Sequence, residues 1–157
     1  MVDLYDELFK IIEVLDREKV PYALCGGLAY SFYVEPRATI DIDFVIQASD
    51  FERIRDILEP LGFEKFAQRM KFDGGAMVID RLTKLFPEES EHLVVDFIFY
   101  EPLPEKMIWE ERRSVDWRGL KLWLVSREGL IALKKMRSST QDKADIEKLE
   151  SSEQELK

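Results

Sequence analysis

The chain has 157 residues and is 46% hydrophobic, which is enough to bury one core, and we expect residues 1–157 to form a single domain. Its 23 Lys and Arg residues against 32 Asp and Glu residues give a formal net charge of −9. This balance argues against broad binding of long nucleic acids, whose usual footprint is basic. One Cys and one His exclude an internal disulfide and a Cys/His zinc site. Any metal must therefore be held by carboxylates, which prefer hard ions such as Mg²⁺ or Mn²⁺.

The amino-terminal residues are acidic where a secretory signal is basic. No stretch of the sequence approaches the roughly 18 apolar residues of a membrane span. We therefore expect a cytoplasmic protein that does not bind membranes.

Four elements are predicted in the first third of the chain. Apolar residues spaced three and four apart predict a helix over residues 3–19. The apolar run 22–25 predicts a short strand that ends at Gly26 and Gly27, and a buried helix follows over residues 28–34. Residues 39–46 alternate as a strand does. One face of this strand carries Ile40, Ile42, Phe44 and Ile46, and the other carries Asp41, Asp43 and Val45.

The rest of the chain adds helices and two hairpins. Ser49 and Asp50 are placed to cap a helix over residues 51–61 that stops at Gly62. The remaining predicted elements are a hairpin of residues 66–72 and 76–82, a strand over 93–100, a helix near 104–112, a hairpin that turns at Arg118 and Gly119, and helices over 126–136 and 142–149. Residues 126–157 would form a C-terminal helical segment. This order predicts an α+β fold in which helices flank a mixed sheet.

Asp41 and Asp43 are the most informative local feature, because acidic residues are disfavoured in strands and these two interrupt an apolar one. Two residues apart in a strand, they share a face, with Cα atoms roughly 6.5 Å apart. Two such carboxylates are not cheaply ionised together without a cation, which a divalent metal would supply. The alternative is that both lie on a solvent-facing side of the strand.

Gly26 and Gly27 lie where a predicted strand ends and a helix begins. Backbone N–H groups and the positive end of the helix dipole then face one turn, an arrangement that receives phosphate oxygens. The alternative is a turn required by geometry alone. The turn is neither a P-loop nor a dinucleotide fingerprint, because neither glycine pattern is present.

Taken together, Cys25-Gly-Gly-Leu-Ala29 and Arg37-Ala-Thr-Ile-Asp-Ile-Asp43 resemble the signature of the polymerase-β-like nucleotidyltransferase superfamily. That signature is a Gly-Gly or Gly-Ser turn, a spacer of about this length, and an Asp, a hydrophobic residue and an Asp or Glu. More specifically, the two segments look like those of small prokaryotic members, which include abortive-infection and toxin–antitoxin nucleotidyltransferases and lincosamide and aminoglycoside adenylyltransferases. The resemblance covers residues 22–46 strongly and the rest mainly in element order.

This resemblance implies a nucleotidyltransferase fold, a third carboxylate on a neighbouring strand and a two-metal mechanism. Asp96, which interrupts an apolar strand as the first two do, is the preferred candidate, and Asp80 is the competing one. Asp41, Asp43 and Asp96 would then be the catalytic and metal-binding residues. The implied ion is Mg²⁺ or Mn²⁺, and the implied substrate is an NTP.

The predicted nucleotide-binding residues are Gly26, Gly27, Arg37 and Lys134. The glycine turn would hold the β- and γ-phosphates. Family members often have Ser at the place of Gly27, and the missing hydroxyl removes one phosphate contact. Arg37 either contacts phosphate or balances the two aspartates. Lys134 precedes an Asp-rich helix, whose Asp142 and Asp145 either anchor this lysine or cap and solvate the helix.

The predicted function is metal-dependent transfer of a nucleoside monophosphate from an NTP to a hydroxyl of a small molecule, a protein or RNA. The alternative is a regulatory module of the same fold that acts by binding a cognate protein partner, as in a toxin–antitoxin pair. An antibiotic-modifying adenylyltransferase is a third hypothesis. Residues 127–141 carry four basic residues and one acidic residue, a net charge of +3, so we expect a local cationic site for triphosphate in an acidic chain.

Overall fold

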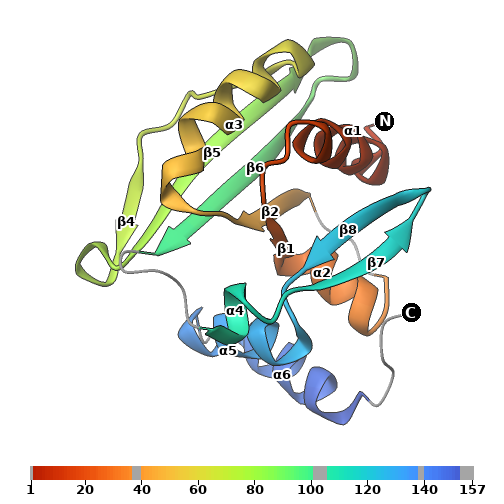
Figure 1. Cartoon of the computed structure of the whole chain (residues 1–157), viewed down its shortest axis with the longest axis vertical. Helices are drawn as coiled ribbons and strands as arrows, with labels where there is room; N and C mark the ends of the chain where they lie inside the picture. The colour runs from red at the N-terminus through yellow and green to blue at the C-terminus, as the bar shows by residue number, and fades with distance from the viewer. Residues whose placement is uncertain (1, 37–39, 101–105, 138–139, 153–157) are drawn as a thin grey trace.

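The structure is a computed structural model that describes residues 2–36, 40–100, 106–137 and 140–152 (Figure 1). Arg37, a predicted nucleotide-binding residue, lies outside the described residues, as do residues 101–105, which include the start of the helix predicted near 104–112. Among the described helices, none is long and apolar enough to cross a membrane.

One mixed sheet of eight strands organises the described part of the chain. Its strands follow the order β3-β5-β6-β2-β1-β8-β7, and β4 pairs with β5. β2 runs parallel to β6 and antiparallel to β1, and β1 runs parallel to β8. The strands are β1 (Ala23–Cys25), β2 (Asp41–Val45), β3 (Phe63–Glu64), β4 (Met70–Phe72), β5 (Met77–Phe86), β6 (Glu91–Tyr100), β7 (Arg113–Trp117) and β8 (Leu120–Leu124).

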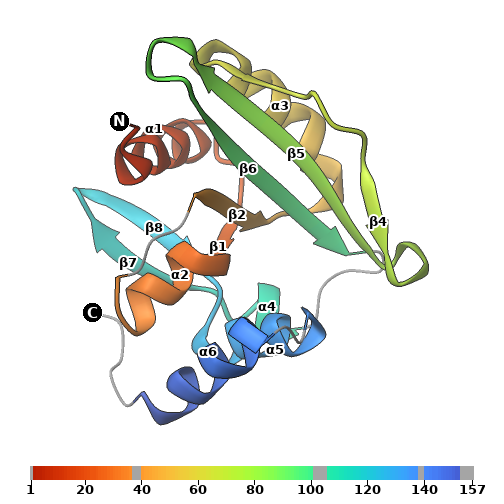
Figure 2. The same cartoon turned by 180° about the vertical axis from the view of Figure 1, so that it is seen from behind.

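Helices flank this sheet, so the predicted α+β fold with a mixed sheet is confirmed (Figures 1 and 2). α3 runs along β5 and β6, and its Phe51 packs on Phe97 of β6 with ring centroids 6.0 Å apart. α5 and α6 lie together near α4 and α2, away from α3 (Figures 1 and 2). The α-helices of the described ranges are α1 (Leu4–Arg17), α2 (Gly26–Tyr33), α3 (Phe51–Leu58), α4 (Lys106–Trp109), α5 (Arg127–Arg137) and α6 (Thr140–Ser151).

Side-chain alternation gives the central strands one buried face and one half-buried face. On β2, Ile42 and Phe44 are fully buried, whereas Asp41 and Asp43 between and before them are half-buried. β6 and β5 alternate in a similar way, and their buried residues join a core to which the helices, α1 and α3 among them, contribute apolar side chains. The other face of these strands therefore remains accessible to solvent and to a ligand.

Two local predictions were wrong. Ile40 was expected on the buried face, but pairing of β2 with β6 begins at Asp41, and Ile40 is 84% exposed. Ser49 and Asp50 were expected to cap the next helix, but no side chain accepts a hydrogen bond at that helix start. The reason is that residues 48–50 already form a 3₁₀ turn, so Asp50 has a helical backbone conformation instead of the extended one of an N-cap.

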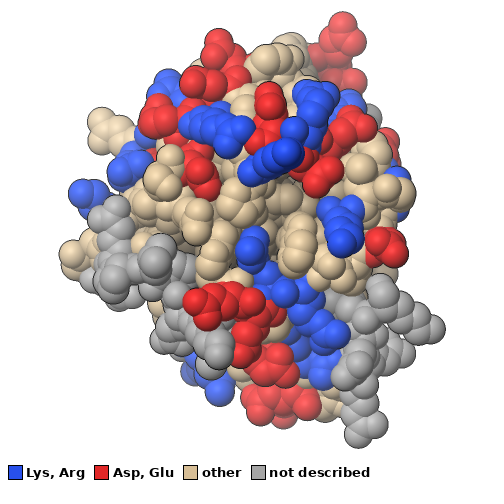
Figure 3. Space-filling view, viewed as in Figure 1, with Lys and Arg blue, Asp and Glu red and all other residues tan. Residues whose placement is uncertain are grey.

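Charged side chains are interspersed rather than separated on the surface formed by α1 and α3 (Figure 3). Lys and Arg lie beside Asp and Glu over this region. The absence of broad binding to long nucleic acids, expected from the net charge of −9, stays a prediction.

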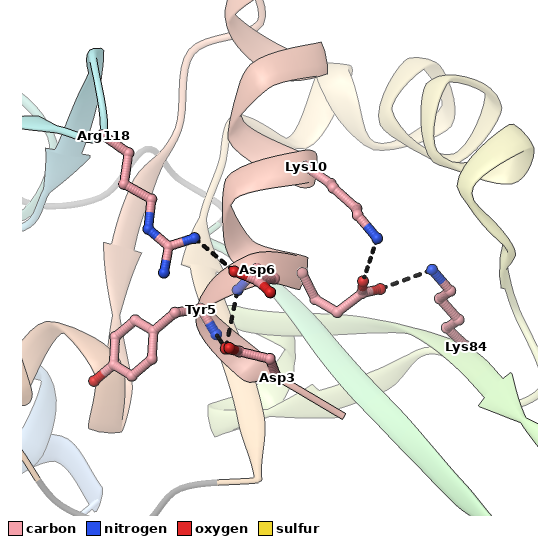
Figure 4. Close-up of polar contacts among 7 residues, drawn as sticks. Asp3, Tyr5, Asp6, Lys10, Lys84 and Arg118 are labelled. Carbon is pink, nitrogen blue, oxygen red and sulfur yellow. Dashed lines mark hydrogen bonds and ion pairs between the residues drawn. The ribbon is translucent and has the colours of Figure 1, made fainter. Parts of the chain in front are cut away.

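A buried carboxylate fastens α1 to the sheet. Glu7 of α1 is only 4% exposed, and its carboxylate accepts hydrogen bonds from Lys84 of β5 at 2.7 Å and from Lys10 at 3.2 Å (Figure 4). The neighbouring Asp6 pairs instead with Arg118 at 2.7 Å, and both of these side chains are largely exposed. Adjacent acidic residues of α1 therefore form two different ion pairs: Glu7 forms a buried one and Asp6 an exposed one.

We expect Glu7→Gln to lower the free energy of unfolding by about 1–3 kcal/mol, because it leaves the Lys84 ammonium beside a neutral group in a poorly solvated place. Asp6→Asn is the matched control and should cost less than about 1 kcal/mol, since exposed pairs contribute little. Urea denaturation at pH 7 measures both values. Equal losses in the two variants would show that the Glu7 pair has no special role in fastening α1.

Candidate active site

The three predicted carboxylates lie on the half-buried face, where the sheet register gathers them. Asp43 of β2 is the direct neighbour of Asp96 on β6 and of Cys25 on β1. Directly paired residues point to the same face, and adjacent strands lie about 4.8 Å apart. Asp41, two residues before Asp43, shares that face. The structure thus brings Asp41, Asp43 and Asp96 to one patch on two parallel strands.

Asp80, the competing candidate for the third carboxylate, lies on the opposite face. It pairs with Phe97, which is fully buried, and is itself fully buried. Arg69 donates to it at 2.6 Å and Lys65 at 3.3 Å. Asp80 therefore pairs with two cations behind the sheet and cannot join Asp41 and Asp43.

Gly26 allows the start of α2 to approach the carboxylate of Asp43. The chain turns from β1 into α2 at Gly26, whose φ of +68° is a conformation that side chains rarely permit. A Cβ at this position would lie 2.2 Å from Oδ2 of Asp43, so only glycine fits. Gly26 and Gly27 are the first two residues of α2, so the helix starts two residues earlier than predicted. Asp43 consequently lies beside the positive end of the α2 dipole.

Arg81 is a site residue that the sequence analysis missed. It is the direct neighbour of Asp96 on β5, and its Nε and Nη2 donate to the two carboxylate oxygens of Asp96 at 2.8 and 3.0 Å. These hydrogen bonds raise the pKa of Arg81, and the charges of Asp41 and Asp43 raise it further. Because side chains alternate along a strand, Arg81 lies on the face opposite to its neighbour Asp80, which is the site face. Its pairing with Asp96 depends on the register between β5 and β6, which the sequence does not show.

Lys134 is placed in the helical layer and is buried there. Its side chain is 3% exposed, and its ammonium donates to Asp145 at 2.8 Å, lies 3.9 Å from Asp142 and is 5.6 Å from the ring centre of Tyr30 on α2. Asp142 and Asp145 are themselves buried, so they anchor this lysine and are not solvated residues of an exposed helix. Lys134 joins α5, α6 and α2, and its contact with a triphosphate stays a prediction.

Asp41 and Asp43 have the chemistry that suits a hard divalent ion. Both offer carboxylate oxygens on a half-buried face, as Mg²⁺ or Mn²⁺ requires. Asp96 accepts hydrogen bonds from Arg81 at both of its oxygens. No group of three His, Cys, Asp or Glu side chains is arranged to hold a metal ion within the part of the chain that the structure describes. The pair on β2 thus fits one ion, and the predicted trio is not assembled around a shared point.

Residues 8–142 match the family model described as "Nucleotidyl transferase AbiEii toxin, Type IV TA system". This span includes the glycine turn, all three carboxylates and Lys134. The chain therefore belongs to the AbiEii nucleotidyltransferase family. At the level of sequence, no curated protein matches the chain.

Solved structures show the same fold for this AbiEii family member at low sequence identity. The lincomycin-bound lincosamide antibiotic adenylyltransferase LnuA is 18% identical, with a TM-score of 0.59 over 93% of this chain and 96% of LnuA. ANT(2″)-Ia in complex with adenylyl-2″-tobramycin is 15% identical, with a TM-score of 0.62 over 92% and 86% of the two chains. A nucleotidyltransferase-like protein from Paracoccidioides brasiliensis is 22% identical, with a TM-score of 0.57 over 90% and 72%. The nucleotidyltransferase fold that the sequence predicted is confirmed.

We expect Gly26→Ala to destabilise the protein more than Gly74→Ala, although the two glycines have nearly the same φ, +68° and +67°. Both variants pay about 1 kcal/mol for an alanine in the left-handed region. Only Gly26→Ala also forces a methyl group against Asp43, which should add at least about 1 kcal/mol, because nothing lies within 4 Å of a Cβ at Gly74.

Thermal and urea unfolding of the two variants measure this difference. Adding Asp43→Ala to Gly26→Ala should recover most of the extra loss, since the carboxylate oxygen at 2.2 Å is then gone and only the Cβ at 3.1 Å remains. Equal destabilisation by Gly26→Ala and Gly74→Ala would contradict the close approach of Asp43 to the start of α2.

Proposed function

We propose that this protein transfers a nucleoside monophosphate from an NTP to a hydroxyl group of an acceptor, with Mg²⁺ or Mn²⁺ as the required ion. The observation that carries the proposal is the placement of Asp43, which lies beside Asp96 in the sheet and against Gly26 at the start of α2. Membership of a nucleotidyltransferase family supports it. A carboxylate pair next to a helix start brings a metal-binding group and a phosphate-binding group to one place.

Asp41 and Asp43 would hold the ion, and each other residue of the site has a separate task. A divalent ion bound there would offset charge on the triphosphate and on the leaving pyrophosphate. The N–H groups of Gly26 and Gly27 face the β- and γ-phosphates in this proposal, supported by their place at the start of α2. Arg37 and Lys134 stay predicted phosphate contacts, and Lys134 would have to leave Asp145 to make one.

In the reaction, the acceptor oxygen forms a bond to the α-phosphorus while the bond from that phosphorus to the bridging oxygen breaks. The electron pair of the broken bond leaves with pyrophosphate. The proton of the hydroxyl passes to the Asp96 carboxylate or to water. The two-metal form predicted from the sequence places a second ion at Asp96. Because Arg81 donates to both oxygens of Asp96, a second ion in that form would share this carboxylate with a guanidinium.

The acceptor and the partner are proposed by chemical class. The structure of ANT(2″)-Ia contains adenylyl-2″-tobramycin, a nucleotide joined to an antibiotic, which supports a hydroxyl as the acceptor group here. The description of the AbiEii family as a type IV toxin supports a cognate antitoxin as protein partner. Metal-dependent nucleotide binding separates the enzyme from the alternative regulatory module, because a module that acts by protein binding does not need it.

We expect Asp41→Asn and Asp43→Asn each to lower nucleotidyl transfer at least about a hundredfold, because a neutral amide binds a hard cation far more weakly than a carboxylate does. The assay incubates the protein with each of the four α-³²P-labelled NTPs, Mg²⁺, and RNA, protein or aminoglycoside and lincosamide acceptors. Label on an acceptor is the product measured.

Asp116→Asn is the matched control, because Asp116 is an exposed strand aspartate on β7, outside the site, and its variant should keep full activity. Transfer that is metal-independent, or that survives unchanged in Asp41→Asn, would overturn the proposed function. Circular dichroism of each variant confirms that a loss of transfer is not a loss of folding.

A further inference from the structure

We propose that Arg81 takes the place of a second metal ion at Asp96, so that this nucleotidyltransferase binds one divalent ion per chain. The inference rests on the proposed function and specifies its metal chemistry. It assigns a task to a residue that neither the sequence signature nor the family match identifies.

The geometry of the Arg81–Asp96 pair is that of a fixed partner. Two parallel hydrogen bonds, at 2.8 and 3.0 Å, use both oxygens of the carboxylate. Asp96 is only 7% exposed, so its charge is poorly solvated and depends on this partner. Both residues lie within long paired strands and are direct cross-strand neighbours, so the contact does not rely on a loop. A second ion would have to displace a charge-assisted bidentate contact held by the sheet itself, or share the carboxylate with the Arg81 guanidinium.

Arg81 places a positive charge where a second ion would bring its own. Its guanidinium cannot lose its proton at neutral pH, so a divalent ion at Asp96 would lie beside a fixed cation. The pKa of Arg81 is raised by Asp41 and Asp43 as well as by Asp96, so its charge is felt across the whole patch.

Arg81 is also placed to act on the substrate side of the patch. Its side chain is 37% exposed, so the guanidinium extends from the pair toward solvent on the site face. Nε and Nη2 donate to Asp96, and the other nitrogen, Nη1, makes no hydrogen bond within the described residues. A guanidinium with a donor available can contact a phosphate oxygen, which is the task that a second ion performs in the two-metal scheme.

The test is the number and affinity of bound Mn²⁺ ions. Electron paramagnetic resonance of free Mn²⁺, with calorimetry as a second method, is used to titrate the whole chain with Mn²⁺ alone. The titration is repeated in the presence of the α,β-methylene analogues of ATP, GTP, CTP and UTP, which cannot be cleaved at the reacting bond. The variants are Arg81→Met, which removes the charge, and Arg81→Lys, which keeps it.

We expect one Mn²⁺ per wild-type chain with nucleotide present. Arg81→Met should bind Mn²⁺ about tenfold more tightly or take up a second ion, because one positive charge has left a patch of three carboxylates. Arg81→Lys keeps the charge but loses the bidentate contact, so its Mn²⁺ affinity should lie between those of the wild type and Arg81→Met. Where Arg81→Met does not fold, the number of ions bound by the wild type and the affinity of Arg81→Lys decide the test. Arg118→Met is the control: Arg118 also pairs with a carboxylate, at 2.7 Å, but away from the site, and its loss should leave Mn²⁺ binding unchanged.

Three results would overturn the inference, and they are distinguishable. Two ions per wild-type chain would show that an ion shares Asp96, which contradicts the role of Arg81 but leaves the proposed function standing. Unchanged stoichiometry and affinity in Arg81→Met would show that Arg81 only supports the fold. No bound Mn²⁺ under any condition would overturn the metal-dependent function together with the inference.

Discussion

The register between β2 and its two neighbours determines which side chains meet on the accessible face of the sheet. β2 pairs with β1 and β6 so that Cys25, Asp43, Asp96 and Arg81 form one cross-strand row. The next row consists of Leu24, Phe44, Phe97 and Asp80, and it points into the core. A shift of one residue in any of these pairings would exchange the two rows and move the carboxylates into the core. Apolar burial on one face therefore fixes the positions of charged groups on the other.

The same sheet holds buried carboxylates for two different purposes. Behind it, Glu7 and Asp80 each meet two cations and fasten α1 and the β3–β4 segment to β5. On the accessible face, Asp96 meets one cation that is also within the field of Asp41 and Asp43. Carboxylates of the first kind are paired with cations behind the sheet, whereas Asp96 lies in a patch with two further carboxylates. The gathering of three carboxylates and one guanidinium on one face, and not the number of acidic residues, marks the candidate site.

Much of the fold could be predicted from the sequence, because periodicity reports burial directly. The helix near residues 3–19, the alternating strand of Asp41 and Asp43, and the hairpin at Arg118 all correspond to elements of the structure. Predictions at element ends were less accurate. Ile40 follows the alternation but lies outside the pairing with β6, and Asp50 has cap chemistry without cap geometry. In both cases the sequence pattern does not show where strand pairing or the helix begins, and that position decides the conformation of the residue.

The candidate site was predictable residue by residue but not as an arrangement. Acidic residues that interrupt apolar strands pointed to Asp41, Asp43 and Asp96, and their shared face needed only alternation and pairing. The contact between Arg81 and Asp96 could not be predicted, because antiparallel register between long strands is not encoded in either strand alone. Burial of Lys134 between Asp145 and Tyr30 was likewise hidden, since a lysine in a charged helix is ordinarily exposed.

A crystal structure of the protein with Mn²⁺ and an α,β-methylene NTP would test the single-ion site directly, because anomalous scattering locates the ions. We predict one peak with oxygens of Asp41 and Asp43 at about 2.1 Å, the phosphates at the start of α2, and Arg81 still bound to Asp96. A peak at Asp96 with Arg81 displaced would contradict the single-ion site. Nucleotide bound elsewhere, with no ion at Asp41 and Asp43, would contradict the assignment of the site itself.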